Sequence, residues 1–169
     1  EMKTRARKVA GKKVDKVWMS TFHSFGVRVL RMYANLLGYE NNFTIYDQED
    51  RERLLKECMH DAKVSDKEMK VYDCLRYIQD AKNSLITPEE YMKEYGKEYE
   101  KGLVARIYAI YEKRLKRNNS MDFDDLIWKP LDLFNSHPEV LEKFREQFKY
   151  IMIDEYQDIN HAQYMLITM

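Results

Sequence analysis

Two short apolar runs of β character lie far apart in the sequence, and the residues between them have the periodicity of helices. The first run, residues 17–20, reads Val-Trp-Met-Ser, and the second, residues 150–153, reads Tyr-Ile-Met-Ile. Two isolated strands do not make a stable sheet. We therefore expect the runs to pair with each other and with strands that this chain lacks. The pattern predicts part of an α/β sheet domain that carries a helical insertion.

The helical middle contains several start and stop signals. Apolar residues recur at helical spacing after Thr21, and Gly38 is expected to end that helix. Asp47 can cap a second helix, and Ser65–Glu68 has the sequence of a capping box that would start a third. Thr-Pro-Glu-Glu, residues 87–90, places a proline at a first helical position. A further helix is expected from Asp122.

The overall charge gives no argument for nucleic-acid binding. The 169 residues include 29 basic and 29 acidic side chains, so only a local patch could attract a polyanion. No apolar run approaches the roughly 18 residues of a membrane span, so no membrane partner is expected. The chain opens on Glu1 rather than on methionine, which hints at a segment of a longer protein.

Two adjacent carboxylates, Asp154 and Glu155, follow the second apolar run, and Gln157 comes two residues later. Ligands of open α/β sheets bind beyond the carboxyl ends of the strands. An aspartate there can hold a water molecule on a Mg²⁺ ion that bridges nucleotide phosphates. A neighbouring glutamate can act as general base, and a glutamine can sense the γ-phosphate. The alternative is structural, since an aspartate after a strand can simply cap a turn.

A nucleotide site also needs a glycine-rich loop whose backbone amides face the phosphates. Residues 10–16, Ala-Gly-Lys-Lys-Val-Asp-Lys, contain a single glycine in the wrong order. We therefore expect this chain alone to bind ATP weakly or not at all.

Four segments together resemble the motifs of UvrD/PcrA/Rep-type superfamily 1 DNA helicases. Residues 151–158, IMIDEYQD, are similar to the Asp-Glu motif of that family, and residues 20–31, STFHSFGVRVLR, are similar to its DNA-track segment. Residues 121–127, MDFDDLI, resemble the segment that precedes the Asp-Glu motif. Residues 1–2, Glu-Met, match the end of a DNA-contacting motif. The order and spacing of all four agree with the family.

The resemblance implies an α/β but predominantly helical chain. Residues 1–42 and 121–169 would form part of the first RecA-like ATPase domain, of the class with a phosphate loop, and residues 43–120 would be an all-α insertion. The phosphate loop is then expected upstream of Glu1, and the second RecA-like domain downstream of Met169. The remaining helicase domains would be partners within the same parent chain.

The resemblance also implies roles for individual residues. Asp154 would hold Mg²⁺ through water, Glu155 and Gln157 would be catalytic, and all three would contact ATP. Thr21, Phe22, His23 and Ser24 would line the single-stranded DNA track, because hydroxyl and imidazole groups can contact phosphates and an aromatic ring can stack on a base.

Several side chains keep a second interpretation. His23 could instead hydrogen-bond within the start of its helix, and Phe22 could belong to the core. Asp122, Asp124 and Asp125 are interpreted as a helix N-cap and first-turn acids, which suit the helix dipole.

The expected function is that of a fragment of a cytoplasmic ATP-dependent DNA helicase with a place in DNA repair. It would act on single-stranded DNA and on duplex–single-strand junctions, with 3′-to-5′ movement, and the fragment alone would be inactive. Two alternatives remain from the sequence. One is a non-catalytic helical module that binds nucleic acid or protein, and the other is the helicase part of a helicase–nuclease.

Overall fold

The computed structural model of this chain describes residues 2–169 and is mostly helical, with one small parallel sheet. It therefore agrees with an α/β chain that is predominantly helical. In order, the elements are α1 Met2–Ala10, η1 Gly11–Lys16, α2 Phe22–Tyr33, η2 Ala34–Leu37, β1 Thr44–Ile45, α3 Gln48–Asp61, α4 Val71–Asn83, α5 Pro88–Tyr95, α6 Tyr99–Arg117, β2 Ser120–Met121, α7 Asp125–Ser136, α8 Pro138–Gln147, η3 Tyr156–Asp158 and α9 His161–Thr168.

The two predicted strands, residues 17–20 and 150–153, are not strands in the structure. Both segments are irregular, because within residues 2–169 the only backbone ladder joins β1 to β2. The second run is also uncovered, since Tyr150 is 94% exposed and Met152 is 92% exposed. An apolar run without a neighbouring strand has neither a hydrogen-bond partner nor a covered face.

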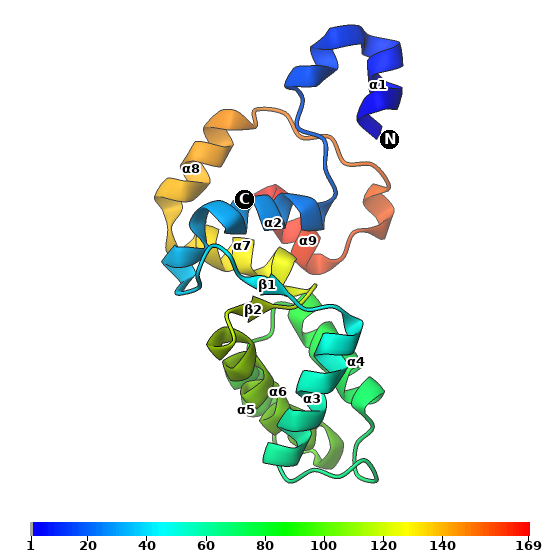
Figure 1. The fold of residues 1–169 in the computed structure, drawn as a ribbon, viewed down its shortest axis with the longest axis vertical. Coiled ribbons are helices and arrows are strands. Elements are labelled where there is room, and N and C mark those ends of the chain that lie inside the picture. Colours follow the sequence, from blue (N-terminus) through cyan, green and yellow to red (C-terminus); the bar gives the residue numbers. More distant parts are fainter. Residues whose placement is uncertain (1) are drawn as a thin grey trace.

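The strands that do form are short and lie elsewhere. β1 and β2 run parallel, with Thr44 opposite Ser120 and Ile45 opposite Met121. The ladder brings together the two ends of a long helical segment, residues 46–119. Figure 1 shows helices α3 to α6 of this segment on one side of the ladder and α2, α7, α8 and α9 on the other. The helical segment therefore leaves the rest of the chain and returns to it at one place.

Three of the predicted helix starts are confirmed, whereas the helix expected to end at Gly38 ends at Tyr33 and is followed by the 3-10 turn η2, whose C-cap is Gly38. Thr21 caps α2 by accepting a hydrogen bond from the amide of Ser24, and Asp47 caps α3 by accepting one from the amide of Asp50. A reciprocal capping box at Thr87 starts α5. These side chains satisfy amides that have no partner inside the helix.

Two predicted helix starts are wrong. Glu68 does accept hydrogen bonds from the amide and hydroxyl of Ser65, but they close an isolated turn, and α4 begins only at Val71. The helix expected from Asp122 begins at Asp125. Only half of the predicted capping box forms at Ser65, because the Glu68 amide donates to the backbone carbonyl of Ser65 rather than to its hydroxyl.

The two sides of the ladder have separate apolar cores. Buried side chains of α3, α4, α5 and α6, with Tyr108 and Tyr111 among the largest, fill one core. The other core is formed by α2, α7, α8 and α9, and Leu133 and Phe144 are among its members. A third cluster around Phe43 lies at the ladder itself. None of the described helices is long and apolar enough to span a membrane.

Helices α2 and α7 approach each other closely at a glycine. A Cβ atom added to Gly26 would lie 1.7 Å from the backbone oxygen of Leu126. In a regular helix that oxygen would accept a hydrogen bond from residue 130, but Pro130 has no N–H to donate. The glycine therefore lets the backbone of α2 reach a carbonyl that the proline leaves free, and this contact sets the position of α2 on α7.

Candidate nucleotide and DNA site

The Asp-Glu segment lies on the surface, between the irregular run 150–153 and α9. The side chains of Asp154, Glu155 and Gln157 are all exposed. The Glu155 amide donates to Asp154 Oδ1 over 3.1 Å, and Gln157 Nε2 donates to Glu155 Oε2 over 2.6 Å. These contacts bring together the three residues that the sequence predicted for the nucleotide.

The backbone of Glu155 is in the left-handed region, with a φ of 51°. Side chains other than glycine rarely adopt this conformation, and it costs on the order of 1 kcal/mol or more. Strained residues of this kind concentrate at functional sites, although the strain alone does not identify one. Here the strain falls on the residue that the sequence predicts to be the general base.

The donor set of this segment fits magnesium. Mg²⁺ keeps several of its waters and is usually held by one or two carboxylates together with substrate phosphates. Asp154 offers an exposed carboxylate of which one oxygen accepts the Glu155 amide, and the other oxygen has no hydrogen-bond partner among the described residues. The residues present are therefore suited to an ion bound through water, with the phosphates as further ligands.

The predicted DNA-track residues begin helix α2. Thr21 and Ser24 are exposed, and the Thr21 hydroxyl donates to the Ser24 hydroxyl over 3.0 Å. Phe22 packs against the core of α2, α7, α8 and α9, which favours the core interpretation of this residue. The two hydroxyls therefore remain accessible to a ligand, and the ring of Phe22 is partly covered.

His23 makes an aromatic contact that its sequence motif did not predict. The His23 ring stacks on Phe123, with 4.0 Å between the ring centroids and 27° between the planes. Burial lowers the pKa of His23, which favours the neutral imidazole. Phe123 stays 51% exposed although it lies between buried aspartates. The only signal in the sequence is an aromatic residue between aspartates, because the exposure of Phe123 follows from the burial of its neighbours in the tertiary structure.

The acidic turn beside Phe123 contains a buried ion cluster. Lys82 Nζ, at the end of α4, lies 2.9 Å from Asp122 Oδ2, 3.0 Å from Asp125 Oδ1 and 2.6 Å from Glu112 Oε1. The side chains of Lys82, Asp122 and Asp125 have no exposed surface. Asp122 and Asp125 also exchange hydrogen bonds with each other's amides. Asp122 thus accepts the amide of Asp125 although the N-cap position of α7 is Asp124, and no local pattern predicted that these acids are buried.

Two further cations complete the cluster. Arg51 of α3 contacts Asp124 over 3.1 Å, and Lys129 of α7 lies 3.5 Å from Glu112. The cluster therefore joins α3, α4 and α6 to α7. It contains four carboxylates, Glu112, Asp122, Asp124 and Asp125, and three cations, Arg51, Lys82 and Lys129. Fully ionised, it would have one excess negative charge.

The pKa values follow from burial and from this imbalance. Burial alone would raise the pKa of Asp122, but the charges of Lys82 and Arg51 outweigh it and lower this pKa to about 2. Burial and the charge of Asp122 raise the pKa of Asp125 to about 7 and that of Asp124 to about 6. Burial would lower the pKa of Lys82, but the surrounding carboxylates raise it well above its ordinary value. One proton shared by the acids would balance the cluster.

Oxygens of Glu112, Asp122 and Asp125 lie within 4.8 Å of one another, which is close enough for a metal ion. The ammonium group of Lys82 already contacts all three carboxylates. A cation supplied by the chain itself thus takes the central position, and these acids are structural rather than metal-binding.

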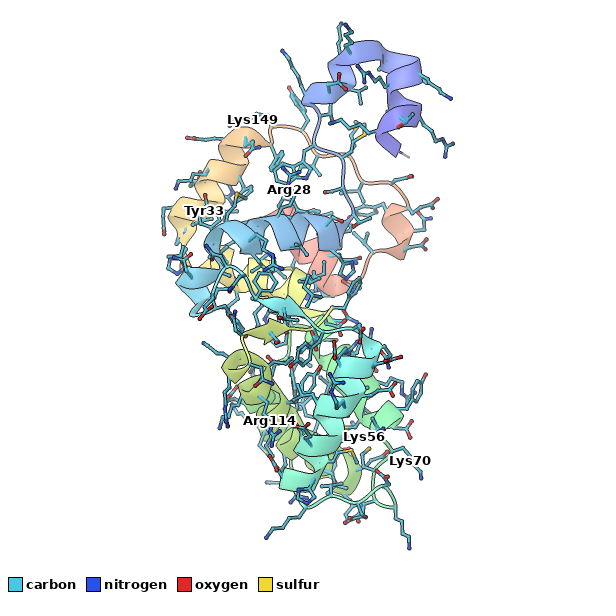
Figure 2. The ribbon with its side chains drawn as sticks, in the orientation of Figure 1. Arg28, Tyr33, Lys56, Lys70, Arg114 and Lys149 are labelled. Carbon is cyan, nitrogen blue, oxygen red and sulfur yellow. The ribbon has the colours of Figure 1, made fainter. Side chains whose placement is uncertain are left out.

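The open cavity between α2 and α8, of about 330 Å³, does not include the Asp-Glu segment. Its lining includes Trp18, Arg28, Tyr33 and Lys143. Figure 2 shows Arg28 and Tyr33 on α2, and Lys56 and Lys70 on the far side of the β1–β2 ladder. The candidate nucleotide residues therefore lie on the surface, outside this cavity.

The model of the UvrD/REP helicase N-terminal domain matches residues 1–169. The chain belongs to this family. The resemblance seen in the sequence is thereby confirmed, although Glu1, which with Met2 matches the end of a DNA-contacting motif, lies outside the described residues.

Curated relatives in this family are ATP-dependent DNA helicases named PcrA. The chain is 41% identical over all 169 residues to the PcrA of Staphylococcus aureus and 40% identical to that of Staphylococcus epidermidis. In both cases the match covers 100% of this chain but only 23% of the relative. The chain thus spans about a quarter of the length of these helicases.

Proposed function

We propose that this chain is part of an ATP-dependent DNA helicase and supplies one side of its ATPase site together with a section of its DNA track. Residues 1–42 and 121–169 would belong to the first RecA-like domain, and residues 43–120 would be its helical insertion. The observation that carries the proposal is the exposed Asp154–Glu155 pair in a chain that matches the helicase family throughout.

At the nucleotide, Asp154 would hold Mg²⁺ through water. When bound, the ion would neutralise developing charge on the phosphates of ATP. Glu155 would accept the proton of the attacking water. Gln157 donates to Glu155 over 2.6 Å, so it can orient this carboxylate and, when ATP is present, contact the γ-phosphate. The phosphate loop would come from another part of the parent protein.

At the DNA, Thr21 and Ser24 would donate hydrogen bonds to phosphate oxygens. Phe123 would take the base-stacking role that the sequence had offered to Phe22, because its ring is half exposed and the Phe22 ring packs in the core. His23 would support Phe123 from behind through the stack. Single-stranded DNA is the proposed ligand, with 3′-to-5′ movement and action at duplex junctions.

The test is ATP hydrolysis by the full-length parent protein with and without single-stranded DNA, for the wild type and for Glu155→Gln. Loss of a general base costs about 10²–10⁴-fold in rate. We expect DNA to stimulate the wild type and Glu155→Gln to abolish turnover while ATP still binds. Glu146→Gln, which changes an exposed glutamate on α8, is the matched control and should hydrolyse ATP like the wild type.

Two results would contradict the proposal. If the parent hydrolyses no ATP, the chain is better described as a non-catalytic helical binding module. If Glu155→Gln retains wild-type turnover, the carboxylates are structural. A nuclease activity in the parent that survives Glu155→Gln would place the chain in a helicase–nuclease.

A further inference from the structure

The end of helix α4 contacts two separate parts of the candidate site. Helix α4 lies in the middle of the helical segment 46–119, far in sequence from both motifs. In the structure it contacts α7 and α9 as well as α3 and α6. Lys82 and Asn83 are its last two residues. Each of them reaches a different motif.

Lys82 fixes the turn that presents Phe123. Its ammonium group contacts Asp122 and Asp125, which lie on either side of Phe123 in the sequence, at 2.9 Å and 3.0 Å. Both contacts are fully buried, so neither can exchange readily with water. The position of the exposed Phe123 ring against His23 thus depends on where α4 ends.

Asn83 accepts a hydrogen bond from Asn160, which lies shortly after the Asp-Glu motif. Asn160 Nδ2 donates to Asn83 Oδ1 over 2.9 Å. Asn160 is also the N-cap of α9, because its Oδ1 accepts the amide of Gln163. This cap turns the Nδ2 group toward Asn83, so position 83 must provide an acceptor. Asn160 is only two residues beyond Asp158, the end of the motif.

The next residues anchor this end of α4. Leu85 has a left-handed backbone, with a φ of 59°, and its side chain packs against the core of α2, α7, α8 and α9. Leu85 therefore contacts the second core at a place separate from the β1–β2 ladder, between Ala81 and Ile86, which pack in the first core. A displacement of the Asp-Glu segment can therefore be transmitted to Phe123 through Asn83 and Lys82, two adjacent residues of α4.

We propose that Lys82 and Asn83 form a joint between the nucleotide motif and the DNA track, and that Asn83 is a positioning residue for DNA-stimulated ATP hydrolysis. The inference rests on the proposed function. DNA on Phe123 shifts the Asp122–Asp125 turn, the end of α4 follows through Lys82, and Asn83 moves Asn160 together with the Asp-Glu segment. Neither residue touches ATP or DNA.

The test measures ATP hydrolysis by the full-length parent protein for the wild type, Asn83→Leu and Asn83→Asp. Leucine removes the acceptor, and aspartate keeps it. A neutral hydrogen bond corresponds to roughly a two- to tenfold change in an equilibrium. We expect Asn83→Leu to lower the DNA-stimulated kcat by that factor, with unchanged hydrolysis without DNA and unchanged affinity for a fluorescent oligo-dT. Asn83→Asp should retain the stimulation of the wild type.

The outcomes separate the joint from the proposed function. Stimulation that is lost in Asn83→Leu and retained in Asn83→Asp supports the joint. Stimulation that is unchanged in both variants overturns it, and so does an equal loss in both, because packing rather than the acceptor would then matter. Thermal unfolding of the three proteins detects a loss of folding. If a lower melting temperature of Asn83→Leu accounts for its lost activity, this result also contradicts the joint. If the wild type shows no DNA-stimulated hydrolysis, the proposed function fails and the joint fails with it.

Discussion

The chain has two acidic segments whose sequences look alike and whose environments are opposite. Residues 122–125, Asp-Phe-Asp-Asp, bury every carboxylate against lysine or arginine and expose the phenylalanine. Residues 154–158, Asp-Glu-Tyr-Gln-Asp, expose every carboxylate. In the first segment the acids hold helices together, and in the second they are free to meet a ligand.

The contrast shows how partners decide what a carboxylate does. A buried charge is tolerated only when an opposite charge and hydrogen bonds compensate its lost hydration. The acids of residues 122–125 have such partners, and their pKa values shift accordingly. The surface acids of residues 154–158 remain hydrated, and hydration leaves their oxygens available to a cation and a water molecule. Three predictions test this division and a fourth tests the helix contact at Gly26, in order of decreasing effect on stability.

The largest effect is expected from Lys82→Met in the 169-residue chain. Removing one partner of a buried ion pair leaves uncompensated charge and costs about 3–5 kcal/mol. Chemical denaturation followed by circular dichroism measures this loss. Lys143→Met, on the exposed face of α8, is the control and should change the free energy of unfolding by less than about 0.5 kcal/mol. Equal effects of the two variants would show that the buried cluster does not hold the helices together.

A smaller loss is expected from Gly26→Ala. The added methyl group would collide with the Leu126 carbonyl, so α2 and α7 must separate, and overpacking of this kind costs about 1–3 kcal/mol. Chemical denaturation measures this loss in the free energy of unfolding. Met32→Ala, on the exposed side of the same helix, is the control. A neutral or stabilising Gly26→Ala would mean that the close approach of the two helices is not required.

The buried acids should also give the chain an unusual pH dependence. The raised pKa values of Asp124 and Asp125 mean that the folded chain binds more protons than the unfolded chain between about pH 4 and 7. Stability therefore rises as the pH falls through this range. Below about pH 4 the lowered pKa of Asp122 reverses the trend, since protonating Asp122 removes its attraction to Lys82.

We expect the free energy of unfolding to rise by on the order of 1–2 kcal/mol from pH 8 to pH 5, because a single shared proton balances the cluster. Melting temperatures at pH 8, 5 and 3 measure this change. In Asp125→Asn, which is neutral at every pH, the rise between pH 8 and pH 5 should shrink. A melting temperature that increases steadily from pH 5 to pH 8 would contradict the shared proton.

The smallest effect on stability is expected from the double change Asp154→Asn and Glu155→Gln. Both side chains are exposed and keep similar volumes, so the free energy of unfolding should change by less than about 0.5 kcal/mol. The same change should abolish ATP hydrolysis by the parent protein. A large loss of stability would place these acids in the same structural class as Asp122.

Local signals in the sequence predicted much of this structure. Thr21, Asp47 and Thr87 are caps because short polar side chains satisfy free amides at helix starts. The three residues predicted for the nucleotide contact one another, since they are neighbours in the chain. These features depend only on residues a few positions apart.

Features that depend on distant partners were not predicted. The pairing of Thr44 with Ser120 and the contacts of Lys82 with Asp122 join residues dozens of positions apart, and no local pattern identifies the partner. The prediction of a strand at residues 150–153 was wrong for the same reason, because an apolar run forms a strand only when a neighbouring strand pairs with it. Phe123 needed the tertiary structure as well, since its exposure follows from the burial of its neighbours.

The β1–β2 ladder gives the helical segment 46–119 a single point of exit and return. If this were the only attachment, the helical segment could rotate about the ladder as a rigid body. The ion cluster and the end of α4 attach the same body at further places, through α3, α4 and α6. Rotation about the ladder would then require buried charges to separate, so the segment is expected to move with α7 as one piece, and a force applied to its far end would be transmitted to the Phe123 turn.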